Sequence, residues 1–357
     1  MTISQRRSAV AAQFDKAGVD GLLVVRDIHV RYLTGLMSSN SSAFLTSNSI
    51  DLYSDGRYAL MAKHVAPDSD FHDERNVLEA AIKTASQRGI ACLGFESAYI
   101  NVAQIESLES LAATHGVRLV PLTNLVEDQR LLKDDQEISD VTSACHITDR
   151  AWEQTIEDGV VGKTEREIAG IVEMYFRKFG AEDRAFESIV ATGPNSAIPH
   201  HHPTDRVVVA GDLLKIDCGA KFNGYHADMT RTVVVGKAAE WQREIYAHVA
   251  HSQQSAMDAC KPGVDVRYIN DVAHGVVAEA GYGETLVHKC GHGVGLEIHE
   301  RPFLGSGDGI LQPRMPITVE PGIYLENRGG VRIEDTILIV ESGYRRLTES
   351  NRELREV

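Results

Sequence analysis

Four acidic residues interrupt segments that otherwise have the apolar composition of buried strands. Asp217 lies in LLKIDCG, Asp228 follows eleven residues later ahead of MTRTVVVG, and Glu320 and Glu334 lie in PITVEPG and GGVRIEDTILIV. A single acid in such a segment usually faces solvent or caps a turn. Four buried carboxylates without partners would cost several kcal/mol each or would hold protons instead. Their number therefore indicates a shared site with a positive counter-charge.

The basic residues near these acids are too few to neutralise them. Lys215, Arg231 and Arg332 are the nearest in the sequence. Two divalent cations would balance four carboxylates, and oxygen ligands with one imidazole suit Mn, Co, Fe or Zn. The sequence therefore predicts a metal site.

The stretch CGHGVGLEIHERP supplies the imidazole. Glycines on either side of His292 would let the backbone pass close to the metals while the ring reaches in. Strand alternation in LEIHE would point His299 into the same cavity, on the substrate side. A glycine-rich loop with structural histidines is the alternative. A nucleotide-binding loop is disfavoured because GHGVG lacks the G-x-G-x-x-G spacing.

A second group of histidines lies in ATGPNSAIPHHHPTDR. His200, His201 and His202 are consecutive and too crowded to serve one site together. The prolines on either side favour an extended, exposed loop. We expect at most one or two of these rings to be functional.

The elements that must position these residues change character near the middle of the chain. Residues 1–125 alternate helices and strands, beginning with a helix that ends near Gly18, which is typical of an α/β domain. After the charged segment NLVEDQRLLKDDQEI the pattern becomes α+β. Thr164 and Glu167 form a capping box that predicts a helix ending at Gly180, and YINDVAHGVVAEAG predicts another. The turn signal Asn223-Gly224 would place Asp217 and Asp228 on adjacent strands.

Composition narrows the class of protein. The chain has 357 residues and a formal net charge of −15, which argues against a nucleic-acid partner. No apolar run approaches the length of a membrane helix. Five scattered cysteines without a CxxC pair are typical of reduced thiols, so we expect a cytoplasmic protein without a membrane segment.

The series IDCG, YHADMTRT, GHGVGLEIHE, VEPG and VRIEDT, in this order, resembles the signature of the pita-bread metallopeptidases. This family includes prolidase, aminopeptidase P and methionine aminopeptidase. YLTGL and SDGRYALMA resemble the N-terminal domain found in prolidase and aminopeptidase P. The resemblance implies an α/β creatinase-like N-terminal domain over residues 1–127 and an α+β pita-bread catalytic domain over residues 128–357.

The same resemblance implies two divalent metal ions per subunit, with Mn expected first and Co or Zn as alternatives. The five implied ligands are Asp217, Asp228, His292, Glu320 and Glu334. Asp228 and Glu334 would bridge the ions. Asp217 would bind one ion, and His292 with Glu320 would bind the other.

For catalysis, Glu320 would act as the general base, and His200 and His299 would donate hydrogen bonds to the carbonyl oxygen. Arg332 matches the family's arginine two residues before the last ligand. Some prolidases have an arginine shortly after HE-x-P that holds a dipeptide's carboxylate. HERPFL instead has Phe303 there, with Arg301 two residues earlier.

These matches predict an exopeptidase that cleaves Xaa-Pro bonds in short proline-containing peptides, and the resemblance to the family implies a homodimer. An Xaa-Pro dipeptidase is the leading hypothesis and an Xaa-Pro aminopeptidase acting on longer peptides is the alternative. A lyase on the same scaffold and a binding module with a vestigial site are further alternatives. The intact ligand set argues against the binding module.

Overall fold

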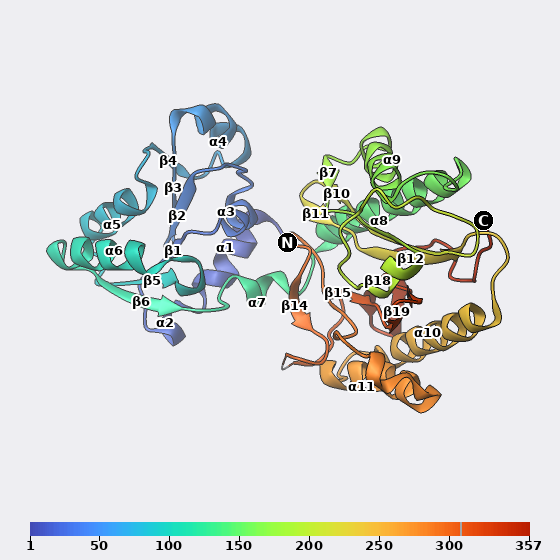
Figure 1. The fold of residues 1–357 in the computed structure, drawn as a ribbon. Helices are drawn as coiled ribbons and strands as arrows, with labels where there is room; N and C mark the ends of the chain where they lie inside the picture. The colour runs from blue at the N-terminus through green and yellow to red at the C-terminus, as the bar shows by residue number, and fades with distance from the viewer. Residues whose placement is uncertain (308) are drawn as a thin grey trace. The chain divides into compact units, whose positions relative to one another are not determined.

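The computed structural model describes residues 1–307 and 309–357, which form two compact units, Met1–Arg130 and Leu131–Val357 (Figure 1). The sequence suggests a domain boundary after residue 127, and this boundary stays a prediction.

The first unit contains a mixed sheet of six strands in the order β4-β3-β2-β1-β5-β6. Its strands are β1 (Gly21–Val24), β2 (Ser41–Leu45), β3 (Ile50–Ser54), β4 (Asp70–Asp73), β5 (Cys92–Glu96) and β6 (Arg118–Leu122). Its helices are α1 (Ile3–Ala11), α2 (Phe14–Ala17), α3 (Asp27–Thr34), α4 (Ala59–Val65), α5 (Val77–Gln87), α6 (Val102–Thr114) and α7 (Glu127–Arg130). The α/β alternation is confirmed, although the first predicted helix is divided into α1 and α2. Gly18 ends α2 in the left-handed conformation, with φ of 67°.

The described residues of the second unit form four longer helices and several small sheets. The helices are α8 (Asp135–Glu157), α9 (Glu165–Lys178), α10 (Glu240–Ala259) and α11 (Val266–Val277). One sheet has the order β12-β9-β8, formed by β8 (Ile189–Thr192), β9 (Leu213–Cys218) and β12 (Met229–Val234). A second has the order β14-β13-β15-β18-β19, formed by β13 (His292–Gly293), β14 (Glu300–Phe303), β15 (Pro316–Val319), β18 (Asp335–Val340) and β19 (Gly343–Arg346). The remaining pairs join β16 (Gly322–Leu325) to β17 (Gly329–Arg332), and β10 (Ala220–Phe222) to β7 (Asp183–Arg184) and β11 (Tyr225–His226).

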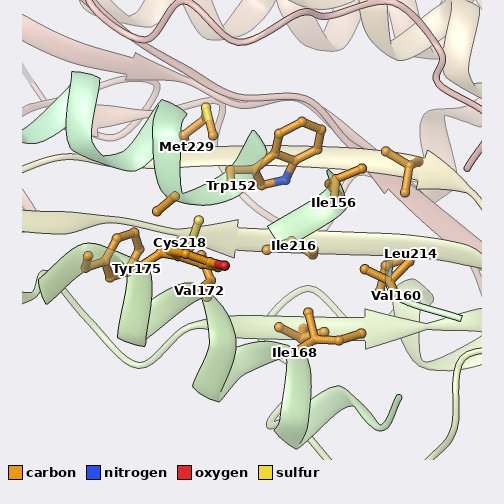
Figure 2. Close-up of a cluster of buried hydrophobic side chains, with 14 of the residues drawn as sticks. Trp152, Ile156, Val160, Ile168, Val172, Tyr175, Leu214, Ile216, Cys218 and Met229 are labelled. Carbon is orange, nitrogen blue, oxygen red and sulfur yellow. The ribbon is translucent and has the colours of Figure 1, made fainter. Parts of the chain in front are cut away.

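The first core of this unit lies between α8, α9 and the β8–β9–β12 sheet. Trp152 and Val172 from the helices pack in one cluster with Ile216 and Met229 from the strands (Figure 2). All four side chains are almost completely buried. Burial of such large apolar side chains contributes roughly 1.5–3 kcal/mol each, so this core holds β9 and β12 firmly in place.

The second core lies between α10, α11 and the β13–β15–β18 part of the other sheet. Met257 and Ile269 from the helices pack with Ile317 and Ile337 from the strands. Each of the two sheets thus has one face held by a pair of helices. The strands that carry the acidic residues come from both sheets.

Local signals in the sequence have mixed outcomes. The capping box is confirmed, because Thr164 caps α9 and exchanges hydrogen bonds with Glu167. The turn at Asn223-Gly224 is also confirmed: both residues have positive φ, 44° and 75°, and they join β10 to β11. Because β9 pairs antiparallel with β12, Asp217 lies opposite Thr230, close to Asp228.

Two expected strands are wrong. GGVRIEDTILIV is not continuous: β17 ends at Arg332, β18 begins at Asp335, and Glu334 lies at the break, where its N–H donates to the Thr230 carbonyl. LEIHE is a sequence of bends rather than a strand. The carbonyl of Gly295, the residue before this segment, accepts hydrogen bonds from the backbone N–H and the ring of His226. The backbone there therefore does not continue the hydrogen-bond ladder of a β-sheet.

Candidate active site

A cavity of about 540 Å³ in the second unit contains all five predicted ligands. Asp217 lies one residue before the end of β9, Asp228 precedes β12, and His292 begins β13. Glu320 follows β15, and Glu334 lies between β17 and β18. The side chains therefore arrive from both sheets, from positions where strands begin, end or break.

His292 is the centre of the closest group. Its Nε2 lies 3.5 Å from Asp228 Oδ2 and 3.5 Å from Glu320 Oε1. Ligand atoms of His292, Asp228 and Glu334 all lie within 4.8 Å of one another. Its Nδ1 lies 3.0 Å from the Gly293 carbonyl, which can only accept. Nδ1 therefore carries the proton, and the lone pair of Nε2 faces the carboxylates, as metal binding requires.

The glycines around His292 have a different use from the one expected. A Cβ on Gly291 would overlap the Thr318 carbonyl, and a Cβ on Gly293 would overlap the Arg301 carbonyl. The backbone at His292 therefore packs closely against β14 on one side and β15 on the other. Glycine is needed there for close strand packing, which fixes the direction of the His292 ring.

The buried carboxylates repel one another. Burial raises the pKa of Asp228 well above its usual value, and the charges of Glu334 and Asp217 add to the effect. Burial, with Glu320 and Asp217, does the same to the pKa of Glu334. Burial raises the pKa of Glu320 to about 7, although Arg332 opposes the shift. In the absence of cations, the pKa values of all three carboxylates therefore lie above their usual range.

Asp217 has one buried oxygen that a bound cation would satisfy. Its Oδ2 accepts from Arg332 Nη2 at 2.5 Å. Its Oδ1 is buried and accepts no hydrogen bond from the described residues. An orphaned carboxylate oxygen is costly unless something positive satisfies it. The donor set, carboxylate oxygens and one neutral imidazole, suits a hard or borderline divalent ion.

The basic residues near the site neutralise little of the negative charge of the carboxylates. Arg332 contacts Asp217, but Arg231 pairs with Asp335 at 2.6 Å. The ammonium of Lys215 is directed to backbone carbonyls, including that of Ile198 at 2.8 Å. Among the described residues, Arg332 is therefore the one of these three that forms an ion pair with a predicted ligand.

The two predicted catalytic histidines line the cavity. The His299 ring stands edge-on to the His292 ring, with centroids 4.3 Å apart. Burial lowers the pKa of His299, and the nearby His200 adds to this effect. Burial also lowers the pKa of His200, with Arg332 contributing. Both rings are therefore neutral at pH 7, and each has one N–H to donate.

The other members of the histidine run differ from the exposed loop that the sequence suggests. His201 is buried, and its Nε2 lies 2.8 Å from Glu165 Oε2. His202 is 89% exposed and lies 4.0 Å from Glu187. The loop is therefore exposed only in part, because the middle ring fastens it to the start of α9.

Of the three predicted substrate-binding residues, Phe303 and Arg332 line the cavity. Arg301 is not among the described residues that line it. The guanidinium of Arg332 donates several hydrogen bonds. Besides Asp217, its acceptors are Thr230 Oγ1 at 2.9 Å and the Tyr324 hydroxyl at 2.8 Å.

The sequence reasoning missed His288 and Tyr324. His288 Nδ1 donates to the Lys289 carbonyl, so its Nε2 accepts from the Tyr324 hydroxyl at 2.8 Å. That hydroxyl in turn accepts from Arg332, which closes a chain of hydrogen bonds to Asp217. The signal available was VHKCGH, in which His288 precedes His292 by four residues.

Comparisons with known proteins agree with this architecture. Residues 139–341 match metallopeptidase family M24, and residues 6–132 match the Creatinase/Prolidase N-terminal domain. A Xaa-Pro dipeptidase of Pyrococcus horikoshii is 38% identical over 347 residues, which cover 95% of each chain. The solved structure of a Xaa-Pro dipeptidase from Bacillus anthracis has a TM-score of 0.96 and 32% identity, and the match covers 100% of both chains. An X-Pro aminopeptidase structure from Thermotoga maritima has a TM-score of 0.89 and 33% identity, covering 95% of this chain and 98% of the other.

These likenesses confirm the predicted fold, a creatinase-like α/β domain followed by a pita-bread catalytic domain. Among the described residues, no helix is both long and apolar enough to cross a membrane. The chain is a hydrolase with a metal-dependent catalytic domain, and it belongs to metallopeptidase family M24.

Proposed function

We propose that this protein is an Xaa-Pro dipeptidase that uses two divalent metal ions. The observation that carries the proposal is one cavity containing four carboxylates and a neutral imidazole whose Nε2 faces them. The relatives named Xaa-Pro dipeptidase, similar over nearly the whole chain, support the choice of substrate.

The charges of the site support two ions. Asp217, Asp228, Glu320 and Glu334 carry four negative charges when ionised, and Arg332 is the one basic side chain described in an ion pair with them. Asp228 and Glu334 would bridge the ions, Asp217 would serve one, and His292 with Glu320 would serve the other. We propose Mn first, with Co or Zn as alternatives, because mixed carboxylate and imidazole ligands suit all three.

A pair of divalent ions, when bound, lowers the pKa of water and polarises the scissile carbonyl. Glu320 would lie beside that water and would take up its proton as a general base. It can then deliver that proton to the leaving nitrogen. His200 and His299 would each donate an N–H to the carbonyl oxygen as it gains charge.

The cavity wall is suited to a proline ring. Phe186, Ile189, Ile298 and Phe303 contribute apolar surface to it. The nitrogen of an Xaa-Pro bond carries no hydrogen, so the leaving group needs no hydrogen-bond acceptor before cleavage. An apolar wall next to the metal ligands therefore favours proline over residues with a free amide N–H.

Xaa-Pro aminopeptidase activity on longer peptides is the second candidate. Two observations favour it: the likeness to the Thermotoga maritima X-Pro aminopeptidase, and the presence of Phe303 rather than a cation beside the site. We also propose a cytoplasmic homodimer, on the basis of the reduced cysteines and the resemblance to the family.

The experiment is hydrolysis of Ala-Pro, Ala-Pro-Ala and Ala-Ala by chelator-treated protein to which Mn, Co or Zn is returned. We expect no activity without metal and, with metal, kcat/KM in the order Ala-Pro, Ala-Pro-Ala, Ala-Ala. Equal or faster cleavage of the tripeptide would favour the aminopeptidase. Comparable rates on Ala-Ala would refute proline selectivity. No cleavage of any of these peptides would refute the proposed function.

A further inference from the structure

A dipeptide substrate brings a charged group into the cavity that longer peptides do not. Its C-terminal carboxylate lies only one residue beyond the scissile bond. A carboxylate that loses water without gaining a cation or strong donors binds poorly. A dipeptidase therefore needs a positive side chain on the cavity wall, beyond the groups that surround the metals.

Most basic groups near the cavity are unsuited to this task. Arg332 already donates to Asp217, Thr230, Tyr324 and the Pro199 carbonyl. The other residues that line the cavity include several histidines, among them His200, which lies close enough to Arg332 for its charge to lower the His200 pKa. Burial and that neighbouring positive charge keep its ring neutral at pH 7.

Lys289 is the remaining lysine or arginine among the described residues that line the cavity. Its side chain is exposed, and its ammonium makes no hydrogen bond or ion pair with the residues that the structure describes. Three N–H donors and a full charge are therefore available to a ligand.

The backbone on both sides of Lys289 is fixed. The Cys290 N–H donates to Asn270 Oδ1 at 3.1 Å, and the Cys290 carbonyl accepts from the Glu320 N–H at 2.8 Å. On the other side, the His288 ring is bonded to Tyr324. Lys289 thus extends a flexible side chain from a rigid base that is tied directly to a predicted metal ligand.

Lys289 and Phe303 line the same cavity, and Phe303 lies opposite the chain just after Lys289. His292 pairs with Phe303, and the Leu304 N–H donates to the Gly291 carbonyl at 2.9 Å. Lys289, three residues before His292, lines the same cavity as Phe303 and Ser306. A proline ring against Phe303 would then have its carboxylate directed along this wall.

We propose that Lys289 binds the C-terminal carboxylate of the dipeptide and is a specificity-determining residue for dipeptides. The inference rests on the proposed Xaa-Pro dipeptidase function and extends it. It also accounts for how a cavity with Phe303 beside the site can still select a substrate with a free carboxylate.

The test compares Ala-Pro with Ala-Pro-amide, which differ by the carboxylate alone, in the metal-loaded protein and in Lys289→Met. For a partly exposed ion pair we expect the KM for Ala-Pro to rise about 5- to 20-fold. The KM for Ala-Pro-amide should change less than about 2-fold, and kcat should be nearly unchanged on both, because Lys289 is remote from bond cleavage. Lys289→Arg should retain most of the preference for Ala-Pro.

Lys261→Met is the matched control, since Lys261 is exposed and is not among the described residues that line the cavity. It should leave both substrates unaffected. Equal effects of Lys289→Met on the two substrates, or none on Ala-Pro, would overturn the inference and leave the proposed function intact. If the unmutated protein cleaves neither substrate, the proposed function fails, and the inference with it.

Discussion

Replacing Glu165 by alanine would remove the anchor of the loop that carries His200. Glu165 is completely buried at the start of α9. Its Oε1 accepts from the Thr192 N–H at 2.8 Å and from Asn195 Nδ2 at 3.0 Å. Its Oε2 accepts from His201 Nε2 at 2.8 Å and from both the N–H and the hydroxyl of Thr204. One carboxylate thus holds both ends of the segment that contains His200.

The magnitude follows from this count of donors. A hydrogen bond to a charged group contributes about 1.5–3 kcal/mol, and such contributions overlap within one network. Removing the carboxylate also leaves buried donors without partners. Breaking a buried charged network of this kind typically costs about 3–5 kcal/mol, so we expect the free energy of unfolding of Glu165→Ala to fall by that amount.

Activity should fall as well, because the loop no longer holds His200 in place. We expect kcat on Ala-Pro to decrease by about 10- to 100-fold, as a misplaced donor to the oxyanion would cause, with metal content unchanged. Glu165→Gln is the control: it keeps the shape and an acceptor oxygen, so it should retain more of both stability and kcat.

The stability effect should depend on pH in a defined direction. Burial alone would raise the pKa of Glu165, but hydrogen bonds from Thr204, Asn195 and His201 outweigh it and lower that pKa. A lowered pKa stabilises the fold above the ordinary glutamate value, near 4.5, and this contribution is lost as the pH falls. The difference in urea-unfolding free energy between wild type and Glu165→Gln should therefore shrink below about pH 4.5.

A loss of stability under about 1 kcal/mol in Glu165→Ala would refute the reasoning about the network. Normal kcat at a temperature where the variant is fully folded would refute the link between Glu165 and His200.

Three further outcomes are expected. Asp228→Ala or Glu334→Ala should lose metal, measured by elemental analysis, together with all turnover, since bridging ligands hold both ions; full metal content with normal activity would contradict this. His299→Ala should lower kcat by roughly 10²–10³-fold with metal content unchanged, and loss of a metal ion instead would show that His299 is a ligand. Metal binding at pH 7 should release protons, seen by calorimetry in buffers of different ionisation enthalpy, because burial raises the pKa of Asp228 and Glu334; affinity independent of pH would refute this.

Part of the site was predictable because its signals are local. Asp217 and Asp228 are separated by a hairpin whose turn is marked by Asn223-Gly224, and antiparallel pairing of β9 with β12 then brings them together. The order of the helices followed from caps and apolar periodicity in the same way. These features depend on residues that are close in the sequence.

Other parts depend on distant contacts that periodicity does not encode. The apolar run around Glu334 looks like one strand, yet it breaks where the chain passes from β17 to β18 and changes partners. Glu165 and His201 form a buried pair across 36 positions of the sequence. Lys289 looks like an ordinary surface lysine in the sequence, yet in the fold it lines the cavity that contains the predicted ligands.

The most direct measurement is titration of Mn²⁺ into the metal-free protein, with bound metal and Ala-Pro hydrolysis followed in the same samples. The account predicts saturation at two ions per chain and activity that appears only as the sites fill. Full hydrolysis of Ala-Pro without bound metal, or saturation without any Ala-Pro hydrolysis, would contradict it.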